Sequence, residues 1–104
     1  MKVKDISDLR VMVIGAHPDD ADLNFGGTAI KLARAGAHVR FVSVCNGSKG
    51  HRVLSEADLA ARRFQEMQRS AKVLGVEKYE TLGCPDCELE PTMEWKRKIT
   101  KTIR

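Results

Sequence analysis

The chain has 104 residues, a length that allows one domain with a core of modest size. Hydrophobic residues make up 42% of it and charged residues 31%, which is typical of globular proteins and excludes a largely disordered chain. The formal net charge of +4 would suit a nucleic-acid partner, but much of the excess lies in residues 96–104. Because Trp95, Ile99 and Ile103 are spaced four apart there, the segment predicts an amphipathic helix with a solvated basic face, and we expect no nucleic-acid partner.

No apolar run reaches the length of a membrane span, and the charged start of the chain lacks the apolar core of a signal peptide. We therefore expect a cytoplasmic protein. Three cysteines are an odd number, which does not indicate a complete set of internal disulfides. The chain ends at Arg104 within a helical pattern and without a stop signal, so we expect residues 1–104 to be the N-terminal portion of one larger domain.

Strand patterns recur three times along the chain. Residues 11–15 form an uninterrupted apolar run, typical of a strand buried on both faces. Residues 38–45 are rich in β-branched side chains and predict a second strand, and residues 78–82 predict a third. Helical patterns separate them, so the sequence favours a doubly wound or related α/β layer with a mainly parallel sheet.

The helices are indicated by their ends and by their apolar stripes. Gly26 and Gly27 lead into a helix that stops at Gly36. A capping box at Ser55 begins a long helix, Pro91 begins the last one, and the long helix ends at Gly75. Its predicted buried stripe consists of Ala60, Phe64, Met67, Ala71 and Leu74.

Chemically reactive side chains follow each predicted strand. His17, Asp19 and Asp20 come after the first, residues 46–51 after the second, and residues 84–87 after the third. In a parallel sheet these loops lie at the same edge, beyond the carboxyl ends of the strands, where ligands bind. We therefore expect a functional site at this edge.

The residues His-Pro-Asp-Asp at 17–20 allow two interpretations. Imidazole and carboxylate are good zinc ligands, and of two adjacent aspartates one can bind a metal while the other acts as a base. Alternatively, one aspartate caps the following helix and His17 is merely a polar residue at the end of a strand. The glycines do not form a dinucleotide fingerprint, and three acids including Asp22 would repel a pyrophosphate, so a cation suits this loop better.

The stretch GAHPDDADLNFGGTAIKLARAG, residues 15–36, resembles the start of the PIG-L/LmbE-like family of zinc-dependent N-acetylglucosaminyl deacetylases. The similarity continues through VCNGSKG, RFQE, AKVLGV and LGCPDCEL, and covers roughly residues 10–90. The resemblance implies a Rossmann-like, three-layer α/β/α fold. It also implies a metal-dependent hydrolase that removes an acetyl group from an N-acetylglucosamine-type sugar or sugar conjugate.

The resemblance further implies roles for single residues. His17 and Asp20 would be zinc ligands, Asp19 the general base, and Arg63 and Asp86 substrate-binding residues. The family's third zinc ligand is a histidine in a later segment that these 104 residues do not contain. The other histidines are His38, expected at the opposite edge, and His51, for which a solvated loop position is the more typical interpretation.

Residues 84–87, Cys-Pro-Asp-Cys, offer a competing interpretation. Cys84 and Cys87 could form a redox pair, or with Cys45 and His51 a structural zinc site, although a lone C-x-x-C is weak evidence. A small metal-binding or thiol-redox module and a non-catalytic α/β binding domain therefore stay open beside the deacetylase. Another divalent metal would suit the same ligands. The oligomeric state is also open, and an uncovered edge strand would favour a homo-oligomer.

Overall fold

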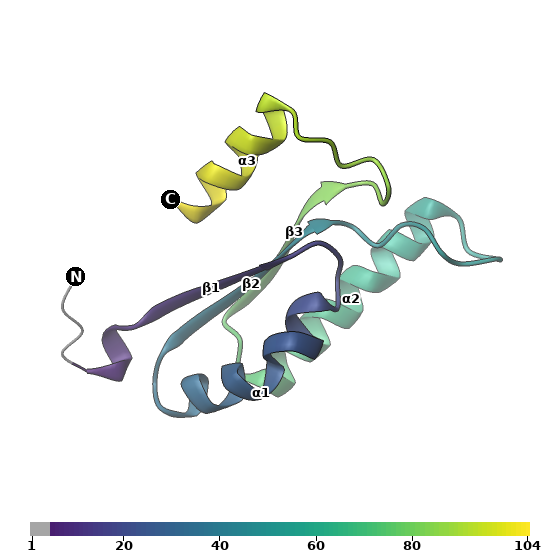
Figure 1. Ribbon diagram of the computed structural model, residues 1–104. Helices are drawn as coiled ribbons and strands as arrows, with labels where there is room; N and C mark the ends of the chain where they lie inside the picture. The colour runs from purple at the N-terminus through teal and green to yellow at the C-terminus, as the bar shows by residue number, and fades with distance from the viewer. Residues whose placement is uncertain (1–4) are drawn as a thin grey trace.

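A three-stranded parallel sheet forms the centre of the structure, a computed structural model that describes residues 5–104. Two helices cover one face of the sheet and a third covers the other, as Figure 1 shows. The predicted three-layer α/β/α fold with a parallel sheet is therefore confirmed. In chain order the elements are a short 3₁₀ helix (Ile6–Asp8), β1 (Arg10–Gly15), α1 (Asp20–Arg34), β2 (His38–Cys45), α2 (Glu56–Leu74), β3 (Lys78–Cys84) and α3 (Met93–Ile103).

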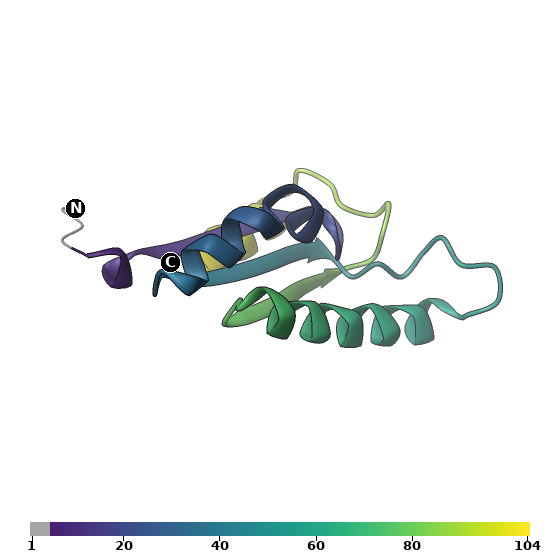
Figure 2. The same cartoon turned by 90° about the horizontal axis from the view of Figure 1, so that it is seen from below.

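The core lies between the sheet and the pair α1 and α2, which run side by side beneath it (Figure 2). Val39 and Phe41 of the central strand β2 are completely buried there, and the ring of Phe41 meets that of Tyr79 edge-on at 5.3 Å. A smaller apolar cluster on the other face includes Val44 and packs against Trp95 and Ile99 of α3. The layers are thus held by burial of apolar side chains on both faces of β2.

The predicted signals at the two ends of α2 are both confirmed. The Ser55 hydroxyl accepts a hydrogen bond from the backbone N–H of Asp58 at 3.1 Å, which satisfies one of the free donors of the first turn. Gly75 follows the last turn with a φ of +77°, the left-handed conformation that glycine adopts without a steric penalty. This turn leads the chain directly into β3.

The structure corrects the predicted start of the first helix. α1 begins at Asp20 and contains Gly26 and Gly27 within its body, whereas the pair was expected to precede it. Glycine disfavours a helix interior by about 1 kcal/mol, which explains the expectation. Tertiary packing outweighs this penalty, because Ala21 and Ala29 of α1 are buried in the core cluster.

The predicted stripe of α2 is wrong at Phe64, which remains 46% exposed. Met67 and Ala71 are buried as expected, and Leu59 joins them. Four residues after Leu59, the position on the inner side belongs to Arg63, whose charged end reaches the carboxyl edge of the sheet. Because Arg63 occupies the inner position, the next residue, Phe64, points outward. This face of α2 therefore contacts both the core and the loops at the edge of the sheet.

The last part of the chain also differs from expectation. β3 extends two residues further than predicted, to Cys84, and α3 begins at Met93 with Thr92 as its N-cap, two residues after Pro91. Ile103 is 60% exposed and does not continue the buried stripe. Within residues 5–104, none of the helices combines the length and the apolar composition needed to cross a bilayer.

Candidate metal centre

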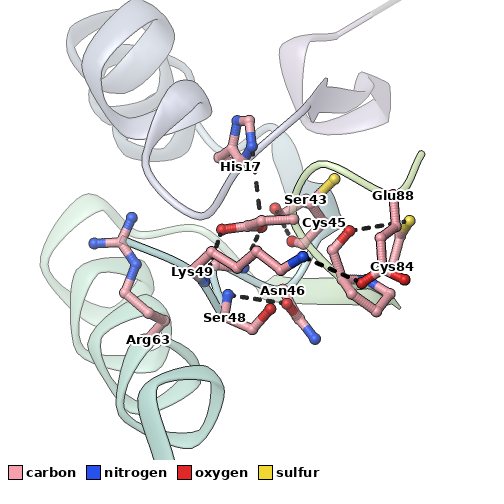
Figure 3. A network of polar contacts seen from close by, with 12 residues as sticks. His17, Ser43, Cys45, Asn46, Ser48, Lys49, Arg63, Cys84 and Glu88 are labelled. Atoms are coloured by element: carbon pink, nitrogen blue, oxygen red, sulfur yellow. Dashed lines mark hydrogen bonds and ion pairs between the residues drawn. The ribbon is translucent and has the colours of Figure 1, made fainter. Parts of the chain in front are cut away.

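The loops that follow the three strands meet at one edge of the sheet, as expected. The backbone N–H of Cys45 donates to the carbonyl of Ala16 at 2.8 Å, and that of Asn46 donates to the carbonyl of Cys84 at 2.9 Å. These bonds continue the sheet beyond its regular ladder and fix the loops relative to one another. In Figure 3, His17, Cys45, Lys49 and Arg63 surround the same small region although they come from separate segments.

His17 and Asp20 are held together by a tight turn. The backbone N–H of His17 donates to Asp20 Oδ2 at 2.8 Å, and the His17 carbonyl accepts from the N–H of Asp20 at 3.2 Å. The imidazole Nδ1 lies 3.9 Å from the same carboxylate oxygen. Gly15 lies against this turn so closely that an added Cβ would be 2.8 Å from the Cβ of Asp20. The end of β1 is therefore shaped to receive the Asp20 side chain.

Asp19 is the N-cap residue of α1, yet its side chain makes no capping hydrogen bond. Aspartate at this position ordinarily accepts a hydrogen bond from the first turn of the helix. Here its half-exposed carboxylate instead lies 3.8 Å from Arg63 Nη2. The interpretation in which one of the paired aspartates merely caps the helix finds no support in these contacts, because Asp20 bonds back to His17 and Asp19 caps nothing.

Asp86 is anchored by the loop that follows β2. Only 7% of its surface is exposed, and its two oxygens accept hydrogen bonds from the backbone N–H groups of Gly47 at 3.0 Å and Lys49 at 3.2 Å. Oδ1 also lies 3.9 Å from His17 Nε2. Gly47 has a φ of +73°, and its Cβ would lie 3.0 Å from the Arg63 side chain. A glycine is needed here to let Arg63 pass beside the loop.

Cys45 completes a group that sequence reasoning missed. A ring nitrogen of His17, the Sγ of Cys45 and a carboxylate oxygen of Asp86 all lie within 4.8 Å of one another. Burial raises the pKa of the Cys45 thiol to about 11, with further contributions from the nearby Cys84 and the Asp86 carboxylate. Along the chain, Cys45 follows His17 by 28 positions, and Asp86 follows Cys45 by 41 positions. The register of the parallel strands therefore brings the three residues together.

The donor set suits a divalent cation. Zinc bonds to nitrogen and carboxylate oxygen at about 2.0–2.2 Å, so a ring nitrogen and a carboxylate oxygen 3.9 Å apart can share one ion. His17 and Asp20, the predicted ligands, meet this condition. His38 lies at the opposite end of β2, as expected, and it pairs there with Glu77. The Nδ1 of His51 accepts hydrogen bonds from the backbone N–H groups of Val53 and Leu54.

Cys84 and Cys87 form no such centre in the part of the chain that the structure describes, where the group of three around Cys45 is the one found. Cys84 is buried and its thiol donates to the carbonyl of Pro85 at 3.5 Å, whereas Cys87 is exposed. Cys87 has a φ of +66° in the turn that presents Asp86. This turn positions the carboxylate rather than the two thiols.

A second contribution absent from the sequence analysis comes from Tyr79 of β3. Its hydroxyl donates to Asp22 Oδ1 at 2.6 Å, and the hydroxyl of Ser70 donates to the other oxygen. Burial and the Asp22 carboxylate raise the pKa of Tyr79 far above its ordinary range. Because Asp22 belongs to the first turn of α1, these bonds tie the turn that carries Asp19 and Asp20 to β3 and α2.

Comparison with known proteins shows similarity to deacetylases. The family model PIG-L, described as GlcNAc-PI de-N-acetylase, matches residues 12–104. Diacetylchitobiose deacetylase from Thermococcus kodakarensis is 39% identical over 97 residues, which cover 91% of this chain and 36% of that protein. A deacetylase of 1D-myo-inositol 2-acetamido-2-deoxy-alpha-D-glucopyranoside from Streptomyces griseus is 32% identical over 90 residues, covering 78% of this chain and 28% of its own.

Among solved structures, N,N'-diacetylchitobiose deacetylase from Pyrococcus horikoshii superposes with a TM-score of 0.85 at 37% sequence identity. The match covers 91% of this chain and 36% of that one. The chain thus spans about a third of the length of the relatives named here. Since the family model extends from β1 to the end of the chain, this protein belongs to the PIG-L family.

Proposed function

We propose that the chain supplies the metal-binding and proton-transferring part of an N-deacetylase that acts on an acetylated amino sugar. The observation that carries this proposal is that the adjacent residues Asp19 and Asp20 make different contacts. Asp20 is held against His17, whereas Asp19 is half exposed and makes no capping bond. Two relatives are named as deacetylases of acetylated amino sugars, which supports the same reaction class here.

In this proposal His17 and Asp20 hold a divalent cation, with zinc as the first choice for nitrogen and oxygen ligands. When bound, the ion polarises the amide carbonyl of the substrate and makes a water molecule more acidic. Asp19 accepts the proton of the attacking water. Asp19 then returns this proton to the amide nitrogen as the carbon–nitrogen bond breaks, which releases acetate and the free amine of the sugar. Arg63 Nη2 lies 3.8 Å from Asp19 Oδ1, so a guanidinium accompanies this carboxylate beside the site.

Arg63 and Asp86 are proposed to bind the sugar. A guanidinium presents several N–H donors in a fixed plane, and a carboxylate accepts from hydroxyl groups, so the two suit a polyhydroxylated substrate. Asp86 is held in place by two backbone N–H groups, and Arg63 lies along Gly47. Both are therefore positioned before substrate arrives, which reduces the ordering required on binding.

The test places this chain in a full-length relative. In a chimera, residues 12–104 replace the matching segment of the Thermococcus kodakarensis diacetylchitobiose deacetylase, and acetate release from diacetylchitobiose is measured. We expect an active chimera in which Asp19→Asn lowers kcat by about 10²–10⁴-fold, the usual contribution of a positioned acid–base group. Zinc content should stay unchanged in that variant.

Two matched variants sharpen the test. Asp58→Asn, at an exposed position in the first turn of α2, also removes a carboxylate and should leave acetate release unchanged. Asp20→Asn should lose zinc together with activity. A folded, zinc-loaded chimera whose activity is indifferent to Asp19→Asn would contradict the assigned role of that residue.

A further inference from the structure

The Sγ of Cys45 lies within 4.8 Å of a ring nitrogen of His17. His17 Nδ1 lies 3.9 Å from Asp20 Oδ2, whereas His17 Nε2 lies 3.9 Å from Asp86 Oδ1. The two ring nitrogens therefore lie near different carboxylates. The Sγ of Cys45 is grouped with His17 and Asp86, because the three donor atoms lie within 4.8 Å of one another, and Asp20 does not belong to this group. We propose that His17, Cys45 and Asp86 form a second cation site, specific for thiophilic divalent ions such as Cd²⁺ or excess Zn²⁺.

Hydrogen bonds hold the backbone of Cys45 and the carboxylate of Asp86, and the Cys45 side chain is buried. The carbonyl of Cys45 accepts hydrogen bonds from the hydroxyls of Ser43 at 2.6 Å and Thr81 at 3.1 Å, while its N–H donates to Ala16. Asp86 is held by two backbone N–H groups of the loop after β2. A site whose donors are fixed by surrounding hydrogen bonds loses little order when the ion binds.

The third donor is the adjustable one. The side chain of His17 is 47% exposed, in contrast to the buried Cys45 and Asp86. Bonds of about 2.0–2.3 Å in a tetrahedral arrangement place neighbouring donors about 3.4–3.7 Å apart. The three donors, which span up to 4.8 Å, must therefore draw closer by about 1 Å, and rotation of the His17 ring supplies such a movement.

The charges around the group favour a cation. Asp86 contributes a carboxylate, and two basic side chains of the surrounding elements, Lys49 and Arg63, are paired with other carboxylates. Lys49 Nζ lies 3.5 Å from Glu88, and Arg63 Nη2 lies 3.8 Å from Asp19. As the ion binds, the Sγ–metal bond forms and the thiol proton is released to solvent. Because thiolate is a softer ligand than imidazole or carboxylate, the group that contains Cys45 favours softer metal ions than the pair His17 and Asp20.

Occupation of this site removes His17 and Asp86 from the roles proposed above, so such an ion would inhibit the deacetylase. Binding itself does not depend on that function and is tested without it. Cd²⁺ alone is titrated into the full 104-residue chain, and the ultraviolet charge-transfer absorption of a sulfur–cadmium bond is recorded. We expect a saturable band that Cys45→Ser abolishes, with apparent Cd²⁺ affinity reduced at least about tenfold, since even lost outer partners cost 10–100-fold.

Cys87→Ser is the matched control, because Cys87 is an exposed thiol in the loop that carries Asp86, and it should retain the band. X-ray absorption of the Cd²⁺ complex of the unchanged chain gives the number of bound sulfurs without any substitution, which covers a variant that fails to fold. A single sulfur beside lighter ligands supports the site. Two or more sulfurs, or a band that follows Cys87 instead of Cys45, would overturn it in favour of a cysteine cluster.

Discussion

The substitution Gly15→Ala tests whether the end of β1 is shaped around Asp20. The new Cβ would lie 2.8 Å from the Cβ of Asp20 and 3.5 Å from the backbone nitrogen of Ala21. Ordinary carbon contacts begin at about 3.5 Å, so the first turn of α1 must move by about 0.7 Å. Asp20 Cβ is attached directly to the helix backbone, and rotation of a side chain cannot relieve the contact. We expect unfolding free energy to fall by about 1–3 kcal/mol.

Urea denaturation of the chain measures this effect. With a slope of about 1 kcal/mol per molar urea, the midpoint should fall by about 1–3 M. Zinc affinity should fall as well, because Asp20 is displaced from His17. Gly27→Ala is the matched control, since it lies within α1 with no other atom within 4 Å of its Cβ. It should stabilise by up to about 1 kcal/mol. Unchanged stability and zinc affinity in Gly15→Ala would refute the proposed fit.

Two further predictions follow from the pKa shifts. Tyr79 is the single tyrosine and keeps its proton in the folded state above pH 10, while the unfolded chain loses it. The free energy of unfolding should therefore decline by about 1.4 kcal/mol per pH unit above pH 10, and less steeply in Tyr79→Phe. Urea titrations at several pH values measure this decline, and an equal decline in the two proteins would disprove the prediction. Cys45, with a pKa of about 11, should resist alkylation at pH 8 while the exposed Cys87 reacts, as peptide mapping would reveal.

Much of the architecture is predictable from local patterns. The glycine that ends α2 acts through its immediate neighbours, and its prediction is confirmed. The apolar run of residues 11–15 forms a strand as predicted, but β1 lies at the edge of the sheet, none of its residues is buried, and Ile14 is 38% exposed. The start of α1 is not predictable in this way. Gly26 weakens a helix locally, and the compensation is the burial of Ala21 and Ala29 in one core cluster with residues of β2, a strand that comes later in the chain.

The candidate site shows the same division. His17, Asp19 and Asp20 are adjacent in sequence, so a motif can indicate them together, and the structure places them in one turn. The sequence analysis considered Cys45 only as a partner of the other cysteines and His51, whereas the structure groups it with His17 and Asp86. Its relation to His17 and Asp86 depends on the register of three parallel strands.

The support from Tyr79 was missed for a similar reason. A tyrosine within a strand is most often an apolar packing residue, and Tyr79 does pack against Phe41. Its hydroxyl, however, meets Asp22 from a helix 57 positions earlier in the chain. A charged residue in the first turn of a helix, facing inward, is the signal that could have indicated a buried polar partner.

The central claim is that Asp20 binds the metal while Asp19 remains free to transfer protons. Zinc content after dialysis, measured by mass spectrometry, tests it most directly in two variants that differ only in position, Asp19→Asn and Asp20→Asn. We predict stoichiometric zinc in the unchanged chain and in Asp19→Asn, and loss of zinc in Asp20→Asn and His17→Ala. Retention of zinc by Asp20→Asn together with its loss from Asp19→Asn would contradict the account and exchange the roles of the two carboxylates.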